Sequence, residues 1–129
     1  MANPNIVNVL SIYGKTTFLT PAVTTNVVLL ANATGSANSI KVNNILVANV
    51  DGTSAISATV ALYTNGSVAQ GSAPTGGTAY PLIYQVSIPA GSTISILDKT
   101  IYLEENQSIV VTSGTASKIT YTVSYEAIS

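Results

Sequence analysis

The sequence has no cysteine, no histidine, no tryptophan and no arginine. Without cysteine the chain has no disulfide, no thiolate metal site and no cysteine nucleophile. Without histidine it also lacks the usual general base of a catalytic triad. We therefore expect a protein that is not an enzyme and that needs no cofactor.

Charge is also scarce. Charged residues make up only 7% of the chain, against about 25% in an average globular protein. The net charge is −1, the hydrophobic fraction is 47% and the mean hydropathy is +0.44. Serine, threonine, asparagine and glycine must supply the polar surface, and such a surface packs against a neighbour with little charge desolvation. We expect a chain that works in an assembly, including copies of itself; a monomeric neutral β-domain is the alternative.

Two classes of partner are disfavoured. Nucleic acid requires clustered cations, and the chain has four isolated ones: Lys15, Lys41, Lys99 and Lys118. The longest apolar run, residues 27–31, is far shorter than the roughly 20 residues of a membrane-spanning helix. The first residues, MANPN, also lack the basic and apolar segments of a secretory signal. We expect no nucleic acid, no membrane and use in the cytoplasm, unless a signal has been removed.

Alternation of apolar and polar residues predicts the fold. It is clearest in residues 84–129, where short β-prone runs are separated by turns such as Pro89-Ala90-Gly91. Its last run places four side chains on one face: Ile119, Tyr121, Val123 and Tyr125. With turns about every 8–12 residues, the pattern predicts a single all-β domain over residues 1–129. We expect an antiparallel β-sandwich of eight or nine short strands, immunoglobulin-like or jelly-roll.

A second clear pattern lies in residues 39–62. The run 39–50 predicts a long strand with these side chains buried: Ile40, Val42, Leu46, Ala48 and Val50. Asp51-Gly52 then predicts a tight hairpin into a returning strand whose expected inward residues are Ile56, Ala58, Val60 and Leu62. Asn65-Gly66 predicts a second turn of this kind. Residues 67–78, SVAQGSAPTGGT, form a small-residue loop that is either a mobile surface loop or a binding loop.

Residues 1–20 are β-prone but irregular. They are expected to form either an arm that adds a strand to a neighbouring subunit or an ordinary edge strand. Gly14-Lys15-Thr16 is not a phosphate-binding loop, because that motif requires glycine at position 9, which is Val9.

The alternation of apolar and polar residues assigns each tyrosine in a strand either to the inward face (inward parity) or to the outward face (outward parity). Tyr84, Tyr121 and Tyr125 have inward parity and are expected in the core. Tyr63 has outward parity, and Tyr80 follows the small-residue loop, so both are expected at an interface. The predicted interface residues are Ile6, Val9, Ile12, Tyr13, Tyr63 and Tyr80.

The acidic residues offer little chemistry. Glu104 and Glu105 are adjacent and fall at a polar corner. A glycosidase-like pair of Asp98 with Glu104, or a calcium site from Asp98, Glu104 or Glu105, remains open. Solvated turn acids are the favoured interpretation, and no metal is expected.

Four segments in order carry a resemblance: ILVANVDGT at 45–53, VSIPAGST at 86–93, IYLEENQS at 101–108 and VSYE at 123–126. The chain resembles small β-sandwich virion proteins of tailed bacteriophages, especially those of cyanobacteria and other aquatic bacteria. The resemblance spans roughly residues 38–129 and brings over no catalytic residues. It implies a non-enzymatic structural role on the virion, either on the capsid surface as a decoration or cement protein or at the neck or tail.

The expected function is therefore a capsid decoration protein that stabilises the head. The expected partners are further copies of the chain, as a homotrimer, and the major capsid or other virion proteins. Its expected location is the virion, assembled in the host cytoplasm. A neck, collar or tail-fibre component is the alternative, and a carbohydrate-binding module with Tyr63 and Tyr80 as its aromatic residues is a third.

Overall fold

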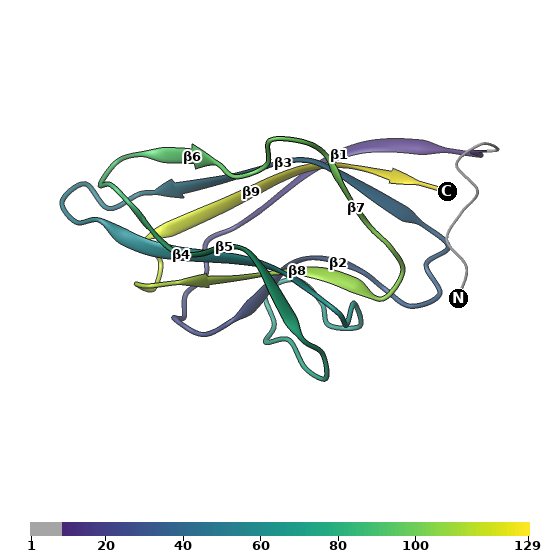
Figure 1. Cartoon of the computed structure of the whole chain (residues 1–129), viewed down its shortest axis with the longest axis horizontal. Helices are drawn as coiled ribbons and strands as arrows, with labels where there is room; N and C mark the ends of the chain where they lie inside the picture. The colour runs from purple at the N-terminus through teal and green to yellow at the C-terminus, as the bar shows by residue number, and fades with distance from the viewer. Residues whose placement is uncertain (1–8) are drawn as a thin grey trace.

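The computed structural model describes residues 9–129, and within that range the chain forms nine strands and no helix. The strands stack in two layers (Figure 1). The strands are β1 Ile12–Leu19, β2 Val27–Asn32, β3 Ser39–Asn49, β4 Ile56–Tyr63, β5 Ala79–Ile88, β6 Thr93–Ser95, β7 Ile101–Leu103, β8 Gln107–Ser113 and β9 Ile119–Ile128. The predicted all-β sandwich is confirmed.

Each layer is one antiparallel sheet. Sheet A has the order β1-β9-β3, with both β6 and β7 along the far side of β3, and sheet B has the order β2-β8-β4-β5. The pairs are nested: β1 with β9, β2 with β8, β3 with β7 and β6, and β4 with β5. A long hairpin rolled into two sheets in this way is a jelly roll, so the strand order decides between the two predicted sandwich types.

The core lies between the inner faces of the sheets. On β9 the predicted inward residues Ile119, Tyr121 and Val123 are fully buried, and Tyr125 is half-buried against them. Facing side chains come from both sheets: Leu29, Ile40, Val42, Ile45, Val47, Ala58, Val60, Ile88, Leu103, Ile109 and Val111. Most are β-branched or leucine, and their burial is the main contribution to stability.

The second half of β3 differs from the prediction. A β-bulge between Val42 and Asn44 adds one residue opposite β9, which exchanges the faces of all residues after it. Ile45 and Val47 are consequently buried, while Leu46 is exposed. The predicted burial of Leu46, Ala48 and Val50 is wrong for this reason.

The predicted hairpin at Asp51-Gly52 is also wrong. Strand β3 belongs to sheet A and β4 to sheet B, so this turn carries the chain between sheets. The Asp51 Oδ1 atom accepts hydrogen bonds from the Thr53 and Ser54 amides and the Thr53 hydroxyl, which is an Asx turn. The Thr53 amide and hydroxyl bonds lower the pKa of Asp51, with smaller effects from the Ser54 amide and Lys118.

Asn49, at the end of β3, ties two of the crossings between sheets together. It is 2% exposed. Its Nδ2 group donates to the carbonyls of Ser54 and Ile88, both at 2.9 Å, and its Oδ1 atom accepts from the Asp51 amide. Ser54 lies in the connection from β3 to β4, and Ile88 is the last residue of β5 before the chain crosses to β6. One carboxamide therefore holds both crossings.

Asn32 repeats this arrangement at the end of β2. Its Nδ2 group donates to the carbonyls of Asn38 and Leu103, both at 2.9 Å, and its Oδ1 atom accepts from the Ser36 hydroxyl. Here the two crossings are β2 to β3 and β7 to β8. Buried asparagines are common only where all their hydrogen-bonding groups find partners.

The N-terminal segment is part of the domain from residue 12 onward. Strand β1 pairs with β9 from Ile12 opposite Ile128 to Leu19 opposite Tyr121 without a shift in register. Of the two predicted alternatives, these residues form an edge strand of their own sheet. The predicted interface residue Ile6 lies outside the described residues.

Candidate functional site

The loop between β4 and β5, residues 64–78, covers part of the outer face of sheet B. Tyr63 points outward, as its parity predicts, but it packs with Val28 and Val110 beneath Val68 of the loop and is 8% exposed. Its hydroxyl accepts the Gly77 amide at 3.0 Å. Tyr63 is therefore not an exposed interface residue, because the loop that follows its strand covers it.

The same loop occupies the outer edge of β2. The Gly71 amide donates to the Val28 carbonyl at 2.8 Å, and the Val28 amide donates to the Ser72 carbonyl at 2.9 Å. A Cβ atom at Gly77 would lie 2.8 Å from the Tyr63 ring, so the close approach of the loop requires glycine there. The small-residue loop is thus hydrogen-bonded onto the fold.

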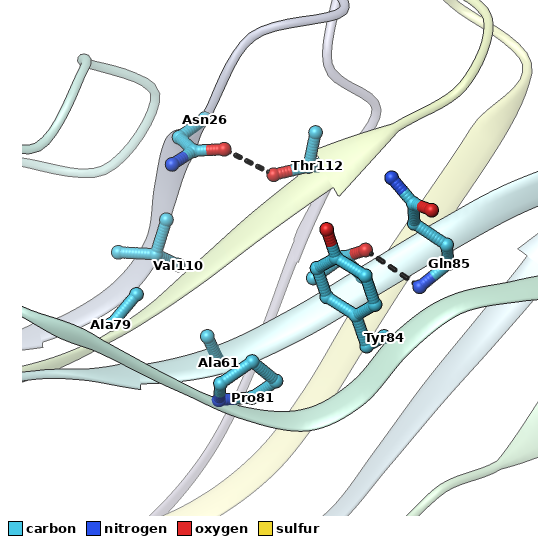
Figure 2. A pocket seen from close by; sticks show the side chains of 9 residues that line it. Asn26, Ala61, Ala79, Pro81, Tyr84, Gln85, Val110 and Thr112 are labelled. Atoms are coloured by element: carbon cyan, nitrogen blue, oxygen red, sulfur yellow. Dashed lines mark hydrogen bonds between the residues drawn. The ribbon is translucent and has the colours of Figure 1, made fainter.

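Beside this loop, a groove of about 230 Å³ opens on the outer face of sheet B (Figure 2). Ala61 and Val110 line its apolar part. The remaining lining residues are Asn26, Thr59, Ala79, Pro81, Tyr84, Gln85 and Thr112. A shallower hollow lined by Thr25, Asn26, Tyr63, Ala73 and Pro74 shares Asn26 with the groove and extends it toward the loop.

A β-bulge in β5 shapes one side of the groove. The pairs Ala58 with Val86 and Val60 with Ile83 leave Tyr84 and Gln85 together opposite Thr59. The extra residue turns Tyr84 to the outer face, where it is 67% exposed. The prediction of Tyr84 in the core is wrong because the bulge reverses its parity.

The bulge is held in a rarely used backbone conformation. Gln85 has a φ of 49°, a left-handed value that costs a residue with a side chain about 1–2 kcal/mol. Its amide donates to the Thr59 hydroxyl at 2.9 Å. Across the groove the Thr112 hydroxyl donates to Asn26 Oδ1, as the two dashed lines in Figure 2 show. Both sides of the groove are therefore fixed by hydrogen bonds.

The Thr59 hydroxyl gives a direct test of this local structure. We expect Thr59→Val to lower the free energy of unfolding by about 1 kcal/mol, because the Gln85 amide loses its acceptor. Thr122→Val on the outer face of sheet A is the matched control and should change it by less than about 0.5 kcal/mol. Urea unfolding of both variants measures the difference, and equal effects would contradict a role for Thr59 in holding the bulge.

The acidic residues considered for a calcium site do not form a metal-binding group. In the part of the chain that the structure describes, no three His, Cys, Asp or Glu side chains gather into a metal-binding group. Glu105 Oε2 accepts the Ala37 amide at 3.2 Å, while Asp98 and Glu104 are exposed. Across residues 9–129 there is also no helix with the length and apolarity to cross a membrane.

The predicted interface residues fall in separate places. Ile12 and Tyr13 are exposed on β1 at one edge of sheet A, and Val9 just before them is half-buried. Tyr80 is 60% exposed on β5, the edge strand of sheet B. They therefore do not form one surface, and whether each meets a partner remains a prediction.

The sequence missed a larger feature, the outer face of sheet A. Phe18 on β1, Thr122 on β9 and Leu46 on β3 lie side by side across the sheet. Phe18 is 71% exposed. The alternation in β1 could have predicted that Phe18 is exposed. The exposure of Leu46 could not be predicted, because it depends on the bulge in β3.

The same face carries a single ion pair, Lys41 with Glu126 at 3.7 Å. Tyr102 on β7 lies directly opposite Lys41 and is 47% exposed. All nine charged residues of the chain fall in the described part, and the strands hold only Lys15, Lys41 and Glu126. The outer face of sheet A is therefore a flat mixture of apolar and hydroxyl side chains whose two opposite charges neutralise each other.

The fold and its surfaces define a charge-poor jelly-roll domain with one flat face of apolar and hydroxyl side chains and one small uncharged groove. A comparison with protein families, curated proteins and solved structures finds no match to this chain.

Proposed function

We propose that the protein is a non-enzymatic structural protein of a tailed-bacteriophage virion, a capsid decoration or cement protein that stabilises the head. The observation that carries the proposal is the outer face of sheet A. This face exposes Phe18, Leu46 and Tyr102 together with threonine and serine side chains. The resemblance to small virion β-sandwiches, described from the sequence, supports the same role.

The energetics of this face favour attachment. Burying apolar area contributes about 25 cal/mol per Å², and hydroxyl groups keep hydrogen-bonding options when a partner covers them. The opposing cost, desolvation of charge, is limited to one pair, Lys41 with Glu126, whose mutual attraction offsets part of that cost. Phe18, Leu46 and Tyr102 are exposed on one face, and exposed large apolar side chains that share a face commonly mark an interaction surface.

The edges of the sheets point to β1 as a second means of assembly. The loop at Gly71 and Ser72 covers the β2 edge, and bulges and Pro81 interrupt β5. Strands β6 and β7 have three residues each, whereas β1 has eight in unbroken register. Among the described strands, β1 is thus the edge best suited to pair with a neighbouring chain, and we propose a homotrimer on the capsid.

Mutation of the flat face tests the attachment. We expect Phe18→Glu to fold normally and to bind purified heads roughly 30-fold more weakly, because a carboxylate replaces an apolar side chain of the face that is 71% exposed. Tyr84→Glu, at an equally exposed tyrosine on the opposite sheet, is the matched control and should bind like the native chain. Co-sedimentation with heads that lack the protein measures both.

The copy number of the protein on purified particles tests where on the virion it is attached. Hundreds of copies per particle fit decoration of the head, whereas a few copies would place the protein at the neck, collar or tail fibre. Absence from particles, or equal loss of attachment in the two variants, would overturn the proposal.

A further inference from the structure

We propose that the groove on the outer face of sheet B binds one sugar residue of a neutral carbohydrate chain. This inference stands on the groove alone and does not depend on attachment to a virion. Tyr63 and Tyr80, the aromatic residues first considered for sugar binding, do not form the site: Tyr63 is covered and Tyr80 does not line the groove. Tyr84 and its neighbours do.

The lining selects for an uncharged ligand. None of the nine described residues that line the groove carries a charge. A phosphate, a carboxylate or an ammonium group would lose water there without gaining an opposite charge. The polar groups are instead two carboxamides, on Asn26 and Gln85, and three hydroxyls, on Thr59, Tyr84 and Thr112. Carboxamides both donate and accept, as the hydroxyl groups of a sugar do.

Tyr84 supplies the apolar platform. Its ring is 67% exposed and lies against the groove (Figure 2). A sugar ring presents C–H groups on its faces and hydroxyls around its rim, so a flat aromatic ring covers the face while the amides reach the rim. Tyrosine suits such a partly solvent-exposed position because its ring is apolar and its hydroxyl remains hydrated.

The site is organised before any ligand arrives. The bulge at Tyr84 and Gln85 keeps a φ of 49° at Gln85, secured by the Thr59 hydroxyl. Backbone strain of this kind concentrates at ligand sites, and β-bulges re-aim side chains there. The bond between Thr112 and Asn26 fixes the opposite carboxamide. Prepositioned side chains reduce the entropy lost on binding.

Size and edge geometry fit one sugar residue of a longer chain. The groove, about 230 Å³, is below the roughly 300–1,000 Å³ of pockets for drug-sized ligands and suits a single sugar ring. The hollow that extends it at Asn26, about 410 Å³, leaves room for the next residue of the chain. A peptide would most readily bind by adding a strand to β5. That edge is interrupted by two register shifts and by Pro81, which has no amide hydrogen.

Titration of ¹⁵N-labelled full-length protein with neutral oligosaccharides tests the proposal. The probes are maltohexaose, cellohexaose, mannohexaose and xylohexaose, with hexagalacturonate as the charged counterpart. We expect at least one neutral probe to shift the amide signals of Gln85 and Thr112 with a Kd of about 1 mM, the strength that one sugar ring provides. Hexagalacturonate should bind more weakly.

Two variants locate the ligand. Tyr84→Ala should weaken binding roughly tenfold, whereas Tyr80→Ala removes a tyrosine of similar exposure from the same strand and should leave it unchanged. If Tyr84→Ala does not fold, Thr112→Val, which releases Asn26, should weaken binding in its place. No response to any neutral probe at tens of millimolar, stronger binding of hexagalacturonate, or equal binding by native and Tyr84→Ala protein would overturn the proposal.

The copy number and head-binding results described above do not bear on this outcome. If the protein attaches to heads through Phe18 but binds none of the sugars, the proposed function stands and the inference of a sugar site is wrong.

Discussion

Replacing Asn49 with aspartate is expected to lower the free energy of unfolding by about 3–5 kcal/mol at neutral pH. The two side chains have nearly the same shape, but aspartate has no Nδ2 donor. The carbonyls of Ser54 and Ile88 would lose their bonds, and a carboxylate would be buried facing them. The crossings from β3 to β4 and from β5 to β6 would both lose this link.

The pH dependence of this loss follows from the burial. Burial beside two carbonyl oxygens raises the pKa of the introduced carboxyl group above its usual value of about 3.9. The folded state then holds the proton more tightly than the unfolded chain. The destabilisation is therefore smallest below about pH 4, grows as the pH rises toward the raised pKa and is constant above it.

Asn44→Asp in the same strand is the matched control. Asn44 is half-buried, and its Oδ1 atom accepts from the Ser95 hydroxyl at 2.6 Å, a bond that a carboxylate retains. We expect a change of less than about 0.5 kcal/mol. Urea unfolding between pH 3 and pH 8 measures both variants, and similar losses in the two would show that Asn49 does not tie the crossings.

The second large effect is expected at Tyr121, the largest fully buried side chain. Its hydroxyl donates to the Thr112 carbonyl at 2.9 Å and lies 3.2 Å from the Ser113 hydroxyl. Tyr121→Ala should cost about 3–5 kcal/mol, because it leaves a cavity between the sheets. Tyr102→Ala, at an exposed tyrosine, should cost less than about 1 kcal/mol.

The same tyrosine should make the protein sensitive to alkali. Burial raises the pKa of Tyr121 to about 12, with a small opposing effect from Ser113, whereas the unfolded value is about 10. The folded state keeps the proton longer, so this contribution is complete below pH 10 and is lost as the pH rises through 12. The total loss is about 2–3 kcal/mol.

Tyr121→Phe isolates this effect. Removing the hydroxyl should cost about 1–2 kcal/mol at pH 7 and make stability between pH 9 and pH 12 flatter than in the native chain. Burial also raises the pKa of Tyr125, but that residue is present in both proteins and its effect cancels in the comparison. An unchanged slope in Tyr121→Phe would contradict the assignment.

The sequence predicted most reliably where strands are regular. The inward side of β9 was confirmed at Ile119, Tyr121 and Val123 because that strand has one buried face and has no bulge of its own: it pairs with β1 from Tyr121 to Ile128 without a register shift. The β-sandwich itself follows from such runs. Strand order could not follow from them, because alternation identifies the face of a strand and not its neighbours.

The errors arise at two bulges and one loop. The extra residues in β3 and β5 move the side chains of Leu46 and Tyr84 to the outer faces of their sheets. No turn residue in the sequence indicates either bulge. Tyr63 was predicted to face outward and does, but its burial depends on contacts with a loop that has no periodicity of its own. The bulge in β5 forms one side of the groove, so the sequence could not have located the groove.

The nested pairing of strands also has a kinetic consequence. Strands β4 and β5 pair across one loop, whereas β1 and β9 pair across nearly the whole described chain, and the Leu10 and Ser11 amides donate to the Ser129 carbonyl. Each outer pair closes a longer loop than the pair inside it, at a rising cost in chain entropy. We expect folding to begin at the β4–β5 hairpin and to finish where the described ends meet, over milliseconds to seconds, as in other domains dominated by distant contacts.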